Sequence, residues 1–532
     1  MSVETILTNA RVLTMRDEGE QRSPQAIAMD AGRIFALGSV TELAPLADSG
    51  TRVLDLGGRT VLPGFIDSHV HFTQTGLGSL GPHVYGLRTR AAVLESIAAA
   101  VHAAGPDVPL LVHGCSFTDL DTPVSRADLD RIAPAAPLML GDVGAHACVV
   151  NSAAGRLIGL ELLPTADEPL RGSANTQARY QFYSQVIDDD MRRRALQRAS
   201  QMALEVGITT VHALEGGSAD GRGWLPQRDV EILLREQSGL PCRTVVYFQS
   251  TDVAQTQLWQ LPRIGGCLWV DGSYFEHTAA LLEPYADHVG GCGCLYFSQS
   301  DLDAFVLRAH CAGMQLSLHA IGDAAIEQVI NAYERALKRA PRRDHRHRIE
   351  HFSLPTPTQI DRVAELGIAV AMQPNFAQHP LRDAAGERLP APLEALLGEE
   401  RYRRRHPYRR ILDAGVLVAG GSDADPKPMG PLIGVEMLAS HPEQQRRLSV
   451  LEALTLYTVN GAKIAFEEAD KGTIAPGKLA DLVVLNRDPL LEPPASLSQI
   501  SVDLTVVAGC VMHRRAGVEL PASALPAASA HH

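Results

Sequence analysis

Lysine is scarce in this sequence: five of the 532 residues are lysine, against 43 arginines, and the first is Lys338. The part of the chain before that position therefore supplies no amine for a functional site. Positive charge as a whole is in deficit, because the formal net charge is −13. This balance favours solubility and gives no support to a nucleic-acid partner.

Long apolar runs are also missing. No run reaches the roughly 20 residues that cross a membrane, and the start, MSVETILTNARVLTM, lacks the basic segment and apolar core of a signal peptide. The eight cysteines are scattered, which fits a reducing cytoplasm better than a disulfide framework. We therefore expect a cytoplasmic, enzyme-sized protein that acts on a small molecule, without a membrane or nucleic-acid partner.

Two kinds of pattern divide the chain. Residues 1–60 and 470–520 consist of short β-like runs between turn residues, which predicts a small β-sandwich built from both termini. Residues 61–469 alternate strand and helix, which predicts an α/β fold with a (β/α)8 TIM-type barrel and an inserted subdomain at about 73–195. The eight predicted strands are 60–71, 207–216, 242–250, 266–273, 314–323, 347–353, 368–376 and 416–425.

Polar residues lie near the ends of several predicted strands, namely His71, His212, Asp271, His319, His351 and Asp423. Functional groups of a barrel come from the carboxyl ends of different strands, so this placement favours one shared site. His69 and His71 are two residues apart on a strand and therefore share a face with Asp67. Imidazole and carboxylate suit Zn, and also Mn, Fe or Co. The pattern predicts a metal site in which Asp423 is also placed to act as general base.

The motifs that carry these residues resemble a known family. GFIDSHVHF, SLHAIGD, RIEHF, GGSDADP and GTIAPGKLADLVVL are similar to motifs of the amidohydrolase superfamily, and specifically of the branch that resembles N-substituted formamide deformylase, amidohydrolase family 3. The resemblance covers nearly the whole chain. It implies a barrel with a β-sandwich made from both ends. It also implies metal ligation by His69, His71, His319, His351 and Asp423, with Asp423 as the base, and it is consistent with a homodimer.

One expected residue is absent. Many members of the superfamily bridge two metals with a carboxylated lysine at the end of strand four, but here the matching position in GGCLWVDGS is Cys267. Three interpretations stay open: Cys267 is a thiolate ligand or bridge, or the site holds one metal and Cys267 is a small buried residue, or the alignment is shifted slightly. Because cysteine is shorter than a carboxylated lysine, the first interpretation requires the strand or the metals to lie further inward.

Four further residues are candidate substrate contacts, and two of them have a structural alternative. His146 lies in the inserted region, where a role in holding a cap together is equally compatible with the sequence. His212 ends the second predicted strand, and a satisfied histidine at the barrel mouth is its alternative. Asp271 lies near the end of the fourth predicted strand, Tyr274 follows that strand, and both are expected near the metals. The basic run RYRRRHPYRR at 401–410 is expected to be a solvated helix face.

The predicted reaction is hydrolysis of the C–N bond of an amide, formamide, carbamate or cyclic amide by attack of a metal-bound hydroxide. One alternative is a mononuclear metal deaminase of a ring amidine, which needs a further acid near the metal. Glu350 precedes His351 and is expected to point away from the barrel lumen, which ranks this alternative lower. The other alternative is a non-catalytic metal-binding regulatory protein, which needs no general base such as Asp423.

Overall fold

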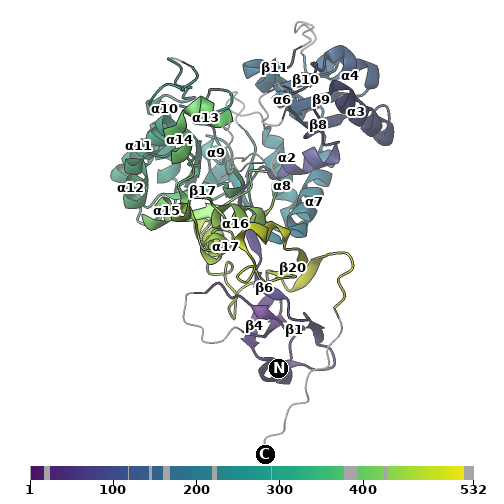
Figure 1. Cartoon of the computed structure of the whole chain (residues 1–532), viewed down its shortest axis with the longest axis vertical. Helices are drawn as coiled ribbons and strands as arrows, with labels where there is room; N and C mark the ends of the chain where they lie inside the picture. The colour runs from purple at the N-terminus through teal and green to yellow at the C-terminus, as the bar shows by residue number, and fades with distance from the viewer. Residues whose placement is uncertain are drawn as a thin grey trace, which may run out of the picture.

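The computed structural model describes residues 2–16, 24–117, 119–142, 147–159, 168–217, 225–288, 290–376, 392–424 and 428–520. Figure 1 shows a central barrel surrounded by helices, a lobe at the upper right and small sheets beside the N-terminus. No helix within these described ranges is long and apolar enough to cross a membrane.

Eight parallel strands form the central sheet, and their spatial order follows their order along the chain. They are β7 (Phe65–Val70), β12 (Ile208–Glu215), β13 (Arg243–Phe248), β14 (Arg263–Ile264), β15 (Gln315–Ala320), β16 (Arg348–His351), β17 (Ala369–Met372) and β18 (Val418–Gly420). Helices before and between them include α7 (Asp189–Glu205), α8 (Gln227–Glu236), α9 (Val253–Leu258), α10 (Gln299–Cys311), α11 (Asp323–Arg339), α12 (Pro357–Leu366), α13 (Pro392–Leu397), α14 (Glu399–Arg404) and α15 (Tyr408–Asp413). After β18 come α16 (Pro431–Ala439), α17 (Val450–Leu456) and α18 (Val459–Ile464). The predicted fold class is confirmed.

The barrel closes where its last strand meets its first. Asp67 Oδ1 accepts a hydrogen bond of 2.9 Å from the N–H of Ser422, a residue 355 positions further along the chain. The N–H of Asp423 donates to the His69 carbonyl at 2.8 Å. The side chain of Asp67 therefore fixes the seam beside which both His69 and Asp423 lie.

Alternation along the strands separates an outer face from an inner face. In β15, Leu316 and Leu318 belong to the large apolar core, whereas Ser317 and His319 lie on the other face. All six residues of this strand are buried, as expected for a parallel sheet covered by helices. The inner face is thus free to carry polar groups, provided that each finds a partner within the barrel.

The fourth strand differs from the prediction. It covers Arg263–Ile264 instead of 266–273, and Gly265 and Gly266 follow it with φ angles of 96° and 57°. A side chain at Gly265 would meet the Ser317 carbonyl oxygen at 2.1 Å, so only glycine fits there. The chain therefore leaves the strand before Cys267, which lies beyond this turn.

Two small sheets pack on each other beside the barrel. One has the order β4 (Arg33–Gly38), β3 (Ala26–Asp30), β1 (Thr5–Thr8), β5 (Arg52–Asp55). The other has the order β2 (Arg11–Val12), β6 (Thr60–Pro63), β19 (Leu482–Leu485), β20 (Val502–Val507), β21 (Cys510–Arg514). Leu7 and Ile27 from one sheet share an apolar core with Leu482 and Leu504 from the other, so this unit uses both ends of the chain. A short helix, α1 (Val40–Leu43), follows β4.

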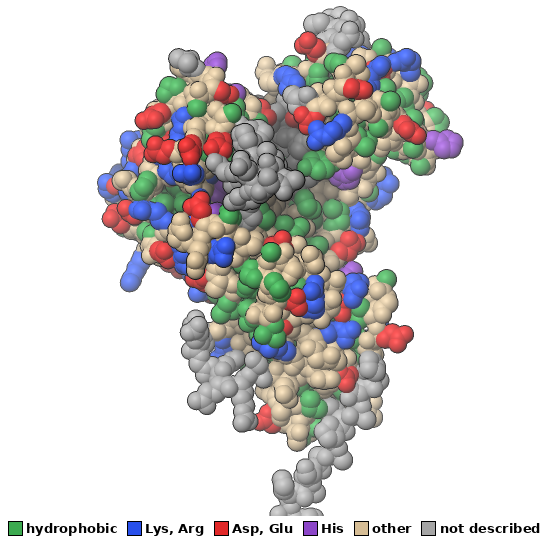
Figure 2. All heavy atoms as spheres, viewed as in Figure 1, with side chains coloured by type: hydrophobic (Ala, Val, Ile, Leu, Met, Phe, Trp, Pro, Cys, Tyr) green, Lys and Arg blue, Asp and Glu red, His purple; other side chains and the backbone are tan. Residues whose placement is uncertain are grey.

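The lobe at the upper right of Figure 1 lies between β7 and β12 in the chain. Its sheet has the order β11 (Leu170–Arg171), β10 (Ala147–Val150), β9 (Leu138–Asp142), β8 (Leu110–Cys115). Its helices are α2 (Phe72–Leu80), α3 (Arg90–Ala104), α4 (Arg126–Ile132), α5 (Ser152–Leu157) and α6 (Gly172–Gln185). Figure 2 shows the surface hollowed between this lobe and the helices around the barrel.

Candidate metal centre

His69 and His71 are held by their Nδ1 atoms. His69 Nδ1 lies 2.6 Å from Glu350 Oε2, and His71 Nδ1 lies 3.3 Å from the Leu214 carbonyl oxygen. Because a carboxylate and a carbonyl only accept, both Nδ1 atoms carry the proton. Each Nε2 atom therefore presents a lone pair on the side away from its partner.

His319 and His351 are held in the same way from the opposite side of the barrel. His319 Nε2 lies 3.3 Å from the Gly272 carbonyl oxygen, so its Nδ1 atom presents the lone pair. His351 Nδ1 lies 2.7 Å from Gln373 Oε1, with the amide oriented so that its oxygen accepts, and its Nε2 atom presents the lone pair. Four imidazole lone pairs thus arise from four separately fixed rings.

These lone pairs meet one carboxylate and one sulfur atom. Asp423 Oδ1 lies 3.2 Å from His69 Nε2 and 3.4 Å from His71 Nε2. Cys267 Sγ lies 3.5 Å from His319 Nδ1 and 3.6 Å from His351 Nε2. We call His69, His71 and Asp423 the first pocket, and Cys267, His319 and His351 the second pocket. Ligand atoms of His69, Cys267 and His351 also lie within 4.8 Å of one another, so Cys267 stands between the pockets.

The electrostatics of the centre favour positive charge. His69 Nε2 is buried and has no hydrogen-bond partner, although Asp423 is close, because both atoms are acceptors. Burial opposes a proton on these rings, yet the Asp423 carboxylate and the Cys267 thiol raise the pKa of His71 to about 10. Although burial acts in the other direction, His69 and His319 hold the pKa of Cys267 well below its usual range. Nitrogen, sulfur and carboxylate donors around such a point fit a divalent cation.

The sequence profile of the amidohydrolase family matches residues 52–513. The chain belongs to the amidohydrolase family. Membership in this family indicates a metal-dependent hydrolase, and it agrees with the donor set of the two pockets.

Related proteins share this architecture over nearly their whole length. This amidohydrolase is 27% identical over 539 residues to YtcJ of Bacillus subtilis (strain 168), covering 95% of this chain and 98% of that protein. It is 26% identical over 573 residues to N-substituted formamide deformylase of Arthrobacter pascens, covering 97% and 99%. A crystal structure of an uncharacterized metal-dependent hydrolase from Pyrococcus furiosus matches with a TM-score of 0.75 at 23% identity, covering 91% of this chain and 99% of that one, and shows the same fold.

In this amidohydrolase the backbone brings Cys267 close enough to the histidines for its short side chain to reach them. The turn at Gly265 and Gly266 takes the chain out of the barrel wall before Cys267, and the side chain is only 2% exposed. A side chain at Gly266 would meet Gln249 Cα at 3.1 Å, so the turn is closely packed against the neighbouring strand. A short side chain therefore comes within 3.6 Å of His351 without a lysine-length arm.

The prediction for Glu350 was wrong. Glu350 is fully buried and points into the barrel, where its carboxylate contacts His69, Arg348 and Ser317. Strict alternation would then turn His351 outward, but His351 has a φ of 69°, which breaks the strand geometry. Two consecutive residues consequently face the interior, and both reach the metal centre.

The candidate substrate contacts are placed differently from one another. His146 lies outside the described residues. His212 lies inside β12, because that strand continues to Glu215, and it is fully buried with Nδ1 3.1 Å from an Arg348 nitrogen. The structure thus places His212 within the barrel floor instead of at its mouth.

Asp271 and Tyr274 follow the turn that carries Cys267. Asp271 is fully buried, and its two oxygens accept three backbone hydrogen bonds, from Ile321, Ala280 and Gly322, of 2.8 to 3.0 Å. Its Oδ1 also lies 3.4 Å from His319 Nε2. The Tyr274 hydroxyl donates to the Ile321 carbonyl at 3.4 Å. Both side chains therefore hold the loop in place, and Asp271 also lies against His319.

Glu215 was missed by the sequence reasoning. It ends β12 and is fully buried, and its Oε1 accepts from the N–H of Thr73 in the first turn of α2 at 2.7 Å. Burial and the nearby Asp229 carboxylate raise its pKa to about 8. Because α2 starts directly after His71, Glu215 fixes the chain that follows this histidine. Its position at the end of a predicted strand was the available signal.

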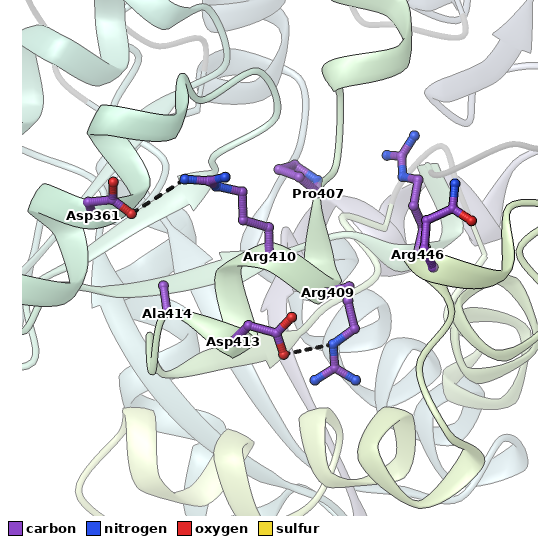
Figure 3. Close-up of a pocket in the computed structure, with 8 residues that line it drawn as sticks. Asp361, Pro407, Arg409, Arg410, Asp413, Ala414 and Arg446 are labelled. Atoms are coloured by element: carbon purple, nitrogen blue, oxygen red, sulfur yellow. Dashed lines mark ion pairs between the residues drawn. The ribbon is translucent and has the colours of Figure 1, made fainter.

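The arginines of the basic run are paired with other groups instead of solvated freely. Figure 3 shows Arg410 directed at Asp361 and Arg409 at Asp413, around a surface cavity of about 480 Å³. Arg404 contacts Asp323 at 2.6 Å, at the start of α11. Arg404 and Arg410 therefore tie α14 and α15 to α11 and α12, whereas the Arg409–Asp413 pair lies within α15.

Proposed function

We propose that this protein hydrolyses the C–N bond of a small amide with the help of one or two divalent cations, most simply Zn. The first pocket would supply His69, His71 and Asp423 as ligands, and the second pocket would supply Cys267, His319 and His351. The support for this proposal is one observation: four histidine lone pairs, a carboxylate and the Cys267 sulfur converge, and the thiol proton of Cys267 is the only one that their inner atoms could donate.

A cation held there would polarise a substrate carbonyl and lower the pKa of a water molecule. The side chains then have separate tasks. Asp423 is the most exposed of the six, with 19% of its side chain accessible, so it faces the substrate. Its Oδ1 is directed at His69 and His71, which leaves Oδ2 for proton transfer.

The proposed step at Asp423 balances as follows. As the water oxygen bonds to the carbonyl carbon, Asp423 Oδ2 takes the proton that this water loses. The same oxygen then delivers the proton to the leaving nitrogen while the C–N bond breaks, so that an acid and an amine are released. The similarity to N-substituted formamide deformylase makes an N-substituted formamide the first substrate to test.

A ring-amidine deaminase fits the site less well. Such a reaction needs an acid free to face the substrate, and Glu350 is the carboxyl group closest to His69 Nδ1. Both oxygens of Glu350 are already engaged by His69, Arg348 and Ser317. Glu350 points into the barrel, but its oxygens are fully engaged by these contacts, so it is not free to act as the acid of a deaminase.

The test is turnover of a panel of formamides, amides, carbamates and cyclic amides by the wild-type chain and by Asp423→Asn, with metal content measured on both. We expect turnover of at least one substrate class, and a loss of about 10²- to 10⁴-fold in Asp423→Asn, the contribution of a general base. Glu327→Gln, a change in an ion pair with Arg362 on the outside of the barrel, is the matched control. Full metal content without turnover on any substrate would support the non-catalytic regulatory alternative instead.

A further inference from the structure

Two buried carboxylates stand behind the metal centre, one for each pocket. Glu350 Oε2 lies 2.6 Å from His69 Nδ1 in the first pocket, and Asp271 Oδ1 lies 3.4 Å from His319 Nε2 in the second. Both carboxylates are fully buried. Neither contacts the inner atoms of the pockets, so each acts on a cation only through the histidine that it touches.

The two carboxylates make different contacts. Asp271 is occupied by three backbone N–H groups, and His319 Nε2 is shared with the Gly272 carbonyl at 3.3 Å. Asp271 therefore mainly holds the loop after the fourth strand in place. The Glu350 carboxylate accepts no backbone N–H among the described residues, and all its hydrogen bonds are with the side chains of His69, Ser317 and Arg348.

Arg348 contacts both Glu350 and the backbone beside His69. One guanidinium nitrogen lies 2.9 Å from Glu350 Oε2 and 2.7 Å from the carbonyl oxygen of Ser68, the residue before His69. The guanidinium also lies 4.2 Å from the centroid of the Tyr247 ring, and it is fully buried. The ion pair therefore holds both the imidazole of His69 and the backbone that leads into it.

We propose that Glu350 is the positioning residue that sets the cation affinity of the first pocket independently of the second pocket. A carboxylate on the outer nitrogen of a metal-binding histidine fixes its tautomer and orientation and strengthens its inner nitrogen as a ligand. Here this carboxylate serves His69 alone, whereas Cys267, His319 and His351 take their orientation from other groups. This inference rests on the proposed metal centre, but it requires no turnover of any substrate.

The experiment measures binding of Co²⁺ and Zn²⁺ to the metal-free chain in competition with a chromophoric chelator. Thiolate-to-cobalt charge-transfer absorption reports any cation bound to Cys267, whose Sγ lies 3.5 Å from His319 Nδ1 and 3.6 Å from His351 Nε2 in the second pocket. If Cys267 bridges both pockets, this signal weakens together with the first pocket and counts against the proposal. In Glu350→Gln we expect one class of sites to weaken by about 10- to 100-fold, while the charge-transfer absorption keeps its wild-type titration. Asp271→Asn is the matched comparison, and any weakening there must appear in the charge-transfer signal.

Several controls keep the result decisive. Glu350→Asp keeps the charge but shortens the side chain, so it must lose affinity as well if the bond to His69 is what matters. Because Glu350→Gln leaves Arg348 without its carboxylate, the double variant Arg348→Met/Glu350→Gln gives the answer if the single variant does not fold. Unchanged affinity at both pockets in a folded variant, or equal loss at both, would overturn the proposal. A wild-type chain that binds neither ion would instead refute the proposed metal centre itself.

Discussion

Two clusters of histidines lie at opposite ends of the same two strands. His319 and His351 come from the carboxyl ends of β15 and β16. On the amino side, His345 and His347 directly precede β16, and His310 lies near the end of α10. All five are buried. Residue type and burial therefore do not distinguish the two clusters. They differ in whether each unprotonated ring nitrogen faces a hydrogen-bond donor.

At the amino side every lone pair meets a donor. His347 Nδ1 accepts from the Leu316 N–H at 3.0 Å, so its Nε2 carries the proton and donates to His310 Nδ1 at 2.8 Å. His310 Nε2 donates in turn to a backbone carbonyl at 2.6 Å. His345 Nδ1 accepts from the His347 N–H at 2.9 Å, and its Nε2 donates to another carbonyl at 2.9 Å. This network is complete with neutral rings.

At the carboxyl side the inner lone pairs meet other acceptors instead. His69 Nε2 and Asp423 Oδ1 are 3.2 Å apart with no proton that either can donate. A histidine cluster is therefore a candidate metal site when its outer nitrogens are held by hydrogen bonds and its inner lone pairs face no donor.

Removal of metal should have the largest effect. We expect treatment with a strong chelator to abolish activity and to lower the free energy of unfolding by about 4 kcal/mol, if free metal had stood about 1,000-fold above its dissociation constant. The converging acceptors would then repel one another without a cation between them. Differential scanning calorimetry with and without chelator measures the change, and an identical melting temperature in both would contradict it.

His347→Ala should damage the other cluster by about 3 kcal/mol. It leaves the Leu316 N–H and one His310 nitrogen without partners, at about 1 to 3 kcal/mol for each buried group. Metal content should stay at the wild-type value, because no group of the two pockets is touched. Urea unfolding together with elemental analysis tests both statements. A loss of metal would show that the two ends of the strands are not independent.

Cys267→Ala should weaken the second pocket by at least about 100-fold in Zn²⁺ affinity, since it removes a ligand and not merely its support. Cys267→Ser is the matched control of similar size with a harder donor atom. Competition titration with a chelator reads out the affinity. A wild-type isotherm for the alanine variant would leave Cys267 as a small buried residue.

The smallest effect concerns pH. Burial lowers the pKa of His345 and of His347 below the ordinary value of 6.5. Below that pH the unfolded chain binds more protons than the folded chain, so this stability is complete above pH 6.5 and is lost as the pH falls. Each group contributes at most about 1.4 kcal/mol per pH unit. Urea unfolding of metal-free protein from about pH 7.5 to 5.5 measures the slope, and His347→Gln should make it shallower.

Much of this arrangement follows from the sequence. The eight barrel strands were predicted in their observed order because each is a short apolar run between helical segments. The period of two also puts His69 on the inner face, and Asp423 follows the last strand. These predictions depend only on local periodicity and on the rule that barrels carry their sites at strand ends.

The remainder depends on backbone angles that periodicity does not contain. Alternation predicts one inward residue from Glu350 and His351, but the φ of 69° at His351 turns both inward. Likewise, the fourth strand was placed over Cys267, whereas the turn at Gly265 and Gly266 ends it earlier. The paired glycines were a visible signal for a break. By contrast, the contact of His69 with Glu350 could not be predicted, because the two residues are 281 positions apart and no local pattern links them.

The seam closed by Asp67 and Ser422 also determines when the site forms. These residues are 355 positions apart, so their contact closes one of the longest loops in the chain. Contacts of such separation form late during folding, because the entropy of the intervening chain must be lost first. Asp423 reaches His69 only when this ring is shut. We therefore expect a refolding chain to regain most of its helices before Asp423 reaches His69, and hence before the first pocket is complete.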